Sequence, residues 1–186
     1  MGTSIGTSTL YSTEWIVDRL RQIGPSSMLD VGAGWGRWGF LAREFLELWE
    51  HRFDRAEWAL RIDAVDVHPG TWTPVHAYVY DRLYEADVRT FEAERHYDVI
   101  VACDVIEHLG KAEGEQVIGR LLGWADHLLL GIPLGPGWLR PGHYGNEHEA
   151  HLAEWDEADF EFFNVRSRKI TETEDGLGYG LFWLTG

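Results

Sequence analysis

The stretch that decides the fold of this chain is residues 28–37, MLDVGAGWGR, an apolar run that ends in an acid and is followed by three glycines at alternate positions. The breaker pair Gly24 and Pro25 precedes it, and apolar residues recur at helical spacing after it. The pattern predicts a strand over residues 26–31, a tight glycine turn and a helix over residues 35–49.

The glycine turn, residues 32–36, predicts a binding site for a nucleotide-like ligand. Glycine permits a positive φ and lets a ligand approach the backbone, and the free N–H groups of the following helix favour an anionic group. The sequence fingerprint of dinucleotide-binding folds, G-x-G-x-x-G, requires its third glycine at position 37, where this chain has Arg37. Asp30 would repel a pyrophosphate but could pair with a ligand amine, so an amino-acid head group fits this turn better.

The run LDVGAGWG resembles motif I of the class I S-adenosylmethionine-dependent methyltransferases, and VDVHP, at residues 65–69, resembles their second motif. The resemblance implies S-adenosylmethionine as cofactor, with Asp66 accepting hydrogen bonds from the ribose hydroxyls and Asp87 taking the adenine amine. It extends over residues 28–130 and 146–160, whereas residues 70–81 match no motif. The cofactor-binding residues that it implies are Asp30, Gly32, Gly34, Gly36, Asp66, Val67, Asp87, Val88 and Asp104.

Strand and helix patterns alternate along the chain, and the near-continuous apolar run at residues 97–103 is typical of a central strand buried on both faces. The alternation predicts a doubly wound, Rossmann-like α/β fold with a seven-stranded, mostly parallel sheet whose last strand is antiparallel. We expect one domain over residues 1–186, with residues 1–11 as a mobile arm. Further strands are expected at 59–67, 82–88, 127–132, 163–171 and 179–184, helices at 13–23, 114–124 and 153–160, and a loop at 71–80.

A second constellation, DVIEH, follows the central strand directly at residues 104–108. If this segment turns helically, Asp104, Glu107 and His108 lie on one face, a plausible half-shell for Mg²⁺ or Mn²⁺. The acid-x-x-Glu-His run with a later His resembles metal-dependent O-methyltransferases such as the small-RNA 3′-terminal 2′-O-methyltransferases, and its Glu-His part resembles the ubiquinone-pathway O-methyltransferases. The metal ligands that this implies are Asp104, Glu107, His108 and His151, with Asp104 replacing the usual Glu.

Composition narrows the choice of partners. The formal net charge of -15 comes from 16 basic and 31 acidic residues, so long nucleic acid and anionic membranes are not expected partners. Cys103 is the only cysteine, and the sequence shows no leader or apolar span of membrane length, so we expect a cytoplasmic protein.

These observations together predict an S-adenosylmethionine-dependent O-methyltransferase that acts on a small diol-bearing acceptor such as a sugar, nucleoside or catechol, with assistance from a divalent metal. A metal-free methyltransferase with His108 or His151 as general base stays open at this stage. A nucleotide-binding oxidoreductase and a noncatalytic subunit of the same fold are weaker alternatives, the first because of Asp30 and Arg37. We expect His143 and His148 to be solvated or to face the substrate, and the oligomeric state stays open.

Overall fold

A computed structural model describes residues 9–142, 147–173 and 175–186 of the chain. Their strands form one seven-stranded sheet in the order β3-β2-β1-β4-β5-β7-β6. Strand β7 runs antiparallel to both of its neighbours, and the other paired strands are parallel. The predicted doubly wound fold with an antiparallel last strand is therefore confirmed. The strands are β1 (Ser27–Val31), β2 (Arg61–Asp66), β3 (Arg82–Glu85), β4 (Tyr97–Cys103), β5 (Ala125–Leu134), β6 (Asn164–Glu172) and β7 (Gly178–Thr185).

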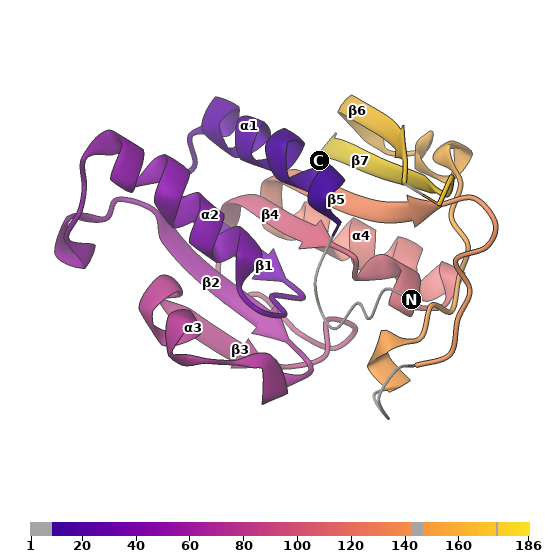
Figure 1. The fold of residues 1–186 in the computed structure, drawn as a ribbon, viewed down its shortest axis with the longest axis horizontal. Helices are drawn as coiled ribbons and strands as arrows, with labels where there is room; N and C mark the ends of the chain where they lie inside the picture. The colour runs from indigo at the N-terminus through magenta and orange to yellow at the C-terminus, as the bar shows by residue number, and fades with distance from the viewer. Residues whose placement is uncertain (1–8, 143–146, 174) are drawn as a thin grey trace.

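Helices cover both faces of the sheet (Figure 1). On one face, Trp38 of α2 packs in a cluster with Met28 of β1, while on the other face Ile118 of α4 packs with Leu29 of the same strand. Successive residues of β1 thus serve opposite layers, as the pleat of a strand requires. The helices are α1 (Thr13–Ile23), α2 (Arg37–Leu46), α3 (Pro74–Val79) and α4 (Lys111–Trp124), and the 3-10 helices are η1 (Leu10–Ser12), η2 (Leu48–Glu50), η3 (Arg55–Glu57), η4 (Pro69–Thr71), η5 (Ile106–His108), η6 (Glu147–Glu149) and η7 (Glu157–Phe160).

Strand β4 occupies the centre of the sheet between β1 and β5, and its bounds are those predicted. Because the chain winds outward from β1 in one direction and from β4 in the other, the strand order reverses between these two strands. In open α/β sheets, ligands bind beyond the carboxyl ends of the strands at such a switch point. The fold therefore places the glycine turn after β1 and the DVIEH segment after β4 side by side.

Three predicted elements differ from the structure. The expected loop at residues 71–80 contains the short helix α3, which begins at Pro74 after the N-cap Thr73. The helix expected at residues 153–160 is reduced to the 3-10 turn η7, and the third strand ends at Glu85 instead of residue 88. Short elements of this kind are held by side-chain hydrogen bonds and tertiary contacts, which apolar periodicity does not report.

The predicted arm, residues 1–11, lies mostly outside the described residues. Of its described part, Leu10 begins η1, which leads directly into α1, and the Ser12 hydroxyl donates a hydrogen bond to the Thr9 carbonyl at 2.8 Å. Within the described ranges, no helix is long and apolar enough to cross a membrane.

Candidate functional site

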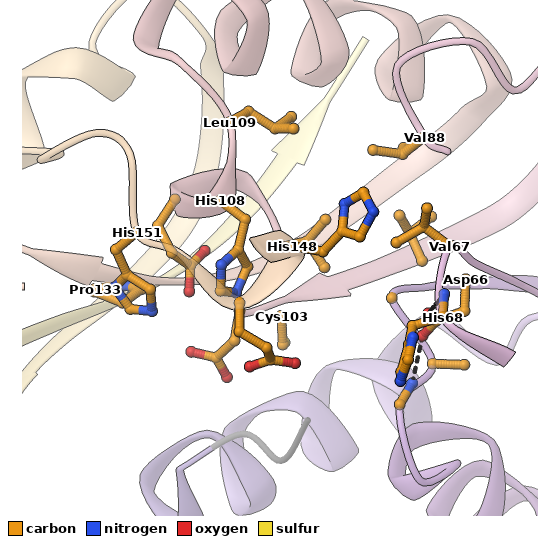
Figure 2. A pocket seen from close by; sticks show the side chains of 18 of the residues that line it. Asp66, Val67, His68, Val88, Cys103, His108, Leu109, Pro133, His148 and His151 are labelled. Carbon is orange, nitrogen blue, oxygen red and sulfur yellow. Dashed lines mark hydrogen bonds between the residues drawn. The ribbon is translucent and has the colours of Figure 1, made fainter. Parts of the chain in front are cut away.

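A cavity of about 840 Å³ lies at the carboxyl ends of the central strands. Figure 2 shows His108 and His151 together at one side of it and Asp66 with His68 at the other. Of the residues predicted for the site, only Asp30 and Gly36 are absent from its walls. The predicted residues that line the cavity are Gly32, Gly34, Asp66, Val67, Asp87, Val88, Asp104, Glu107, His108 and His151.

The glycine turn has the backbone that its sequence predicts. Gly32, Gly34 and Gly36 all have positive φ, at 72°, 51° and 83°. At Gly32 a Cβ would lie 2.4 Å from a methyl group of Val105, so a larger residue would collide there as well as strain the backbone. Gly36 is the N-cap of α2, which therefore begins at Arg37.

Asp30 lies under the turn and not on the cavity wall. Its carboxylate is fully buried, and the Tyr80 hydroxyl donates a hydrogen bond to Oδ2 at 2.5 Å. Burial raises the pKa of Asp30 to about 7, although hydrogen bonds from Tyr80 and from the Gly39 backbone oppose the shift. In this structure Asp30 lies under the start of α2 and is not among the residues that line the cavity, so its pairing with a ligand amine stays a prediction.

Two further acids lie at the predicted cofactor end of the cavity. Asp66, at the end of β2, accepts hydrogen bonds from the Gly34 amide at 2.8 Å and from the His68 amide at 2.7 Å (Figure 2). Each of its oxygens keeps a second lone pair for a hydroxyl donor. Asp87 instead pairs with Arg89, whose Nε lies 2.9 Å from Oδ2, and this hydrogen bond lowers the pKa of Asp87.

Glu107, His108 and His151 form a cluster at the opposite end of the cavity. Each offers one ligand atom, and these atoms all lie within 4.8 Å of one another. The 3-10 turn η5 supplies Glu107 and His108, whereas His151 enters on a segment that pairs antiparallel with Arg140. The two imidazole rings meet edge to face with their centroids 4.9 Å apart. The structure thus brings together three of the four residues predicted as metal ligands.

Hydrogen bonds fix both histidines of the cluster. Nδ1 of His108 lies 3.0 Å from the Ala150 carbonyl, which can only accept, so Nδ1 carries the proton and Nε2 is the acceptor nitrogen. Nε2 of His151 lies 2.8 Å from a guanidinium nitrogen of Arg140 and accepts from it. Burial lowers the pKa of His108, which favours the neutral imidazole that metal ligation and general-base catalysis both require.

Glu107 is buried without hydrogen bonds from other described residues that would offset the loss of water around its carboxyl group. It is 1% exposed, and neither of its carboxylate oxygens has a hydrogen-bond partner on another described residue. Burial, and secondly the charge of Asp104, raise the pKa of Glu107 well above its ordinary value. A buried carboxyl group with open lone pairs beside the acceptor nitrogen Nε2 of His108 fits a divalent cation by its donor chemistry. His151 would join as a ligand only by giving up its hydrogen bond to Arg140.

Asp104 does not share a helical face with Glu107 and His108, and that prediction is wrong. Its φ is 55°, in the left-handed region, and the helical turn begins only at Ile106. Asp104 lines the cavity but lies outside the three-residue cluster. Burial, and secondly the charge of Asp104, raise the pKa values of Cys103 and Tyr179.

Residues that the sequence analysis did not single out complete the walls. Arg140 and Trp138 line the cavity beside His151. The Trp138 ring stacks on the His151 imidazole with the ring centroids 6.2 Å apart. Arg140 is the only Lys or Arg between residues 133 and 149, a signal that could have indicated a role in the site. His148 also lines the cavity, whereas His143 lies outside the described residues.

No protein-family model and no curated protein matches the sequence. The structure is similar to that of magnesium protoporphyrin IX methyltransferase from Synechocystis PCC 6803 with bound S-adenosylhomocysteine, with a TM-score of 0.65, 19% identity, and coverage of 95% of this chain and 83% of that one. It is similar to an S-adenosylmethionine-dependent methyltransferase from Clostridium acetobutylicum, with a TM-score of 0.67, 12% identity, and coverage of 93% and 89%.

A third similar structure is 1,6-didemethyltoxoflavin-N1-methyltransferase from Burkholderia thailandensis with bound 1,6-didemethyltoxoflavin and S-adenosylhomocysteine, with a TM-score of 0.64, 19% identity, and coverage of 94% and 77%. The chain has the class I methyltransferase fold. This fold is the one that the LDVGAGWG run predicts, and its glycine turn, Asp66 and the Glu107 cluster all open into the same cavity.

Proposed function

We propose that the protein is an S-adenosylmethionine-dependent methyltransferase that acts on a small-molecule acceptor. The observation that carries this proposal is a single cavity, in a methyltransferase fold, that joins the glycine turn to the buried cluster of Glu107, His108 and His151. Similar structures hold S-adenosylhomocysteine or S-adenosylmethionine, and one of them also holds a small heterocyclic substrate. A net charge of -15 supports a small acceptor over a polyphosphate chain.

The cofactor lies along the β1 and β2 side of the cavity in this proposal. Its amino-acid end packs over the glycine turn, where the absent side chains leave the backbone accessible. Asp66 receives the two ribose hydroxyls on its remaining lone pairs, and Val67 and Val88 contact the adenine, with Asp87 beside the exocyclic amine. This orientation directs the sulfonium methyl toward the Glu107 cluster.

The acceptor binds at the Glu107 cluster, and the reaction is O-methylation of a diol-bearing molecule. Glu107, His108 and His151 would hold a divalent cation, which when bound lowers the pKa of a ligated hydroxyl. Two imidazoles with one carboxylate suit Mn²⁺ better than Mg²⁺, which prefers an all-oxygen shell. The Ala150 carbonyl orients His108, as outer hydrogen bonds commonly do for metal-ligating histidines.

The protein's other contribution is alignment, because methyl transfer is an in-line displacement. Holding two reactants in the correct geometry can supply about 7 to 11 kcal/mol of the barrier. The alternative to the metal is His108 or His151 as a general base, which typically contributes about 100- to 10,000-fold.

Calorimetric titration with S-adenosylhomocysteine, with and without Mn²⁺, tests the cofactor and the metal separately. A screen of sugars, nucleosides and catechols as acceptors then follows, each with and without chelator. We expect chelator to abolish transfer while the affinity for S-adenosylhomocysteine stays nearly unchanged. Absence of any S-adenosylhomocysteine binding would overturn the methyltransferase proposal.

The variant His151→Ala distinguishes the metal from the general base. With a metal, it needs more Mn²⁺ for half-maximal rate; with a general base, it loses rate at every Mn²⁺ concentration and shifts the pH profile. The matched control is His96→Ala. His96 is exposed and pairs with Asp126, and it directly precedes the amino end of β4, whereas the cavity lies at the carboxyl ends of the strands. Full activity in excess chelator would leave the histidines as bases.

A further inference from the structure

The segment between β2 and β3 matches no motif, yet its helix α3 touches the glycine turn. Thr73 and His76 form a reciprocal cap at the start of α3, in which the Thr73 hydroxyl accepts from the Val75 amide at 3.3 Å and Nδ1 of His76 accepts from the Thr73 amide at 3.0 Å. His76 is completely buried. The cap therefore fixes both the helix start and the direction of the His76 ring.

The cap also determines which nitrogen of His76 carries the proton. Because the Thr73 amide donates to Nδ1, the proton of the neutral ring is on Nε2. That nitrogen lies 3.0 Å from the carbonyl oxygen of Gly34, 42 positions earlier in the sequence, and donates to it. The amide of the same glycine donates to Asp66, so both polar groups of the Gly34 residue are held by side chains.

Tyr80, directly after α3, supports the other end of the turn. Its hydroxyl donates a hydrogen bond at 2.5 Å to Asp30, which lies two residues before the first glycine. Its ring packs so closely on α2 that a Cβ at Gly39 would lie 2.5 Å from it. The rings of His76 and Tyr80 stack at 5.8 Å, so the two side chains act as one unit.

We propose that His76 and Tyr80 are positioning residues that hold the glycine turn in its cofactor-binding conformation. Neither lines the cavity, so they act on the cofactor only through Gly34 and Asp30. Three glycines at alternate positions give an unsupported turn many accessible conformations, and restricting them costs conformational entropy on binding. Side chains that already hold the turn reduce this entropic cost before the ligand binds. The inference rests on the proposed function in that the ligand is S-adenosylmethionine.

A pair of substitutions at His76 separates turn positioning from helix capping. The amide nitrogen of Gln can take the place of Nε2, so His76→Gln keeps the donor to Gly34 and loses the acceptor for Thr73. The carbonyl oxygen of Asn can take the place of Nδ1, so His76→Asn keeps the cap and loses the bond to Gly34. The two variants are equally conservative, and they differ in which hydrogen bond remains.

We expect His76→Asn to weaken S-adenosylhomocysteine binding by about 3- to 10-fold, the usual loss for one hydrogen bond, and to raise the KM for S-adenosylmethionine while kcat at saturation stays close to that of the wild type. His76→Gln should stay close to the wild-type affinity. The control Val75→Ala, at an exposed position of the same helix, should leave the affinity unchanged. Tyr80→Phe keeps the ring over Gly39 and should weaken binding within the same range as His76→Asn.

Equal affinity of the Asn variant and the wild type, or equal losses in the Asn and Gln variants, would overturn the positioning role and leave His76 as a helix cap. A wild-type protein that binds no S-adenosylhomocysteine would instead overturn the proposed function, so the two failures are distinguishable. Nitrogen-15 NMR of the His76 ring gives a readout independent of the ligand, because the inference requires the Nε2–H tautomer.

Discussion

The two ends of the cavity are built in different ways. At the glycine turn, Gly34 uses both its amide and its carbonyl, and each oxygen of Asp66 accepts a backbone hydrogen bond. At the other end, both oxygens of Glu107 are buried without such a partner. Buried polar groups in native proteins are almost always paired, and exceptions tend to mark functional sites. The difference is that Gly34 and Asp66, which line the cofactor end, are already paired in the folded chain, whereas in our proposal a ligand supplies the partners that Glu107 lacks at the acceptor end.

The largest expected effect is at the cofactor end, in Gly34→Val. A β-branched residue disfavours a φ of 51° and places methyl groups in the space that a ligand over the turn must occupy. We expect the affinity for S-adenosylhomocysteine to fall by at least about 1,000-fold, or about 4 kcal/mol, measured by calorimetry.

The matched control for this variant is Gly24→Val. Gly24 has a φ of 61° after α1, and a Cβ there would meet nothing within 4 Å. This control adds similar backbone strain outside the cavity, so it should lower stability and leave the affinity unchanged. If both variants bind the ligand as the wild type does, the glycine turn is not the cofactor site and the comparison of the two ends loses its basis.

Much of the fold could be predicted from the sequence because its strongest patterns are local. The apolar run at residues 97–103 is long enough to define β4 at both ends, and the glycines before Arg37 mark the start of α2. Helix α3 could not be found from apolar periodicity, because it is six residues long and depends on a cap made by Thr73 and His76. Pro74 at its first position was the available signal.

The sequence predicted most of the residues that line the site, but it predicted less of how they are arranged. Spacing alone placed Asp104 with Glu107 and His108, but the left-handed backbone at Asp104 interrupts the helical geometry on which that spacing argument depends. The hydrogen bond of Arg140 to His151 and that of Tyr80 to Asp30 join segments far apart in the chain. Such contacts follow from tertiary packing, which a single sequence does not encode in any local pattern.

An intermediate effect is expected from the pH dependence of Asp30. The pKa of this carboxyl is about 7 in the folded protein against 3.8 ordinarily, so the folded state binds its proton more tightly. Its contribution to stability is complete below about pH 4 and is lost as the pH rises through 7. The free energy of unfolding should therefore fall by roughly 2 to 4 kcal/mol over this range on account of Asp30.

Asp30→Asn isolates this contribution, because the amide oxygen still accepts from Tyr80 and does not titrate. Urea unfolding at pH 5 and pH 8 should show the variant gaining stability relative to the wild type at the higher pH. A constant difference between the two proteins at both pH values would mean that Asp30 titrates alike in the folded and the unfolded protein, and that burial does not raise its pKa.

The smallest expected effect is a gain in stability at the acceptor end, in Glu107→Met. Methionine has nearly the length of glutamate and no polar atoms that need partners, and replacing an unpartnered buried polar group by an apolar one is neutral or stabilising. In metal-free protein, we expect the free energy of unfolding to rise by about 1 kcal/mol, with Mn²⁺ binding lost and S-adenosylhomocysteine binding unchanged. Glu115→Met, at an exposed position of α4, is the control and should leave all three quantities unaltered. Destabilisation of Glu107→Met by 2 kcal/mol or more would show that the carboxylate is already compensated within the folded chain, and the contrast between a complete end and an incomplete end of the cavity would then be wrong.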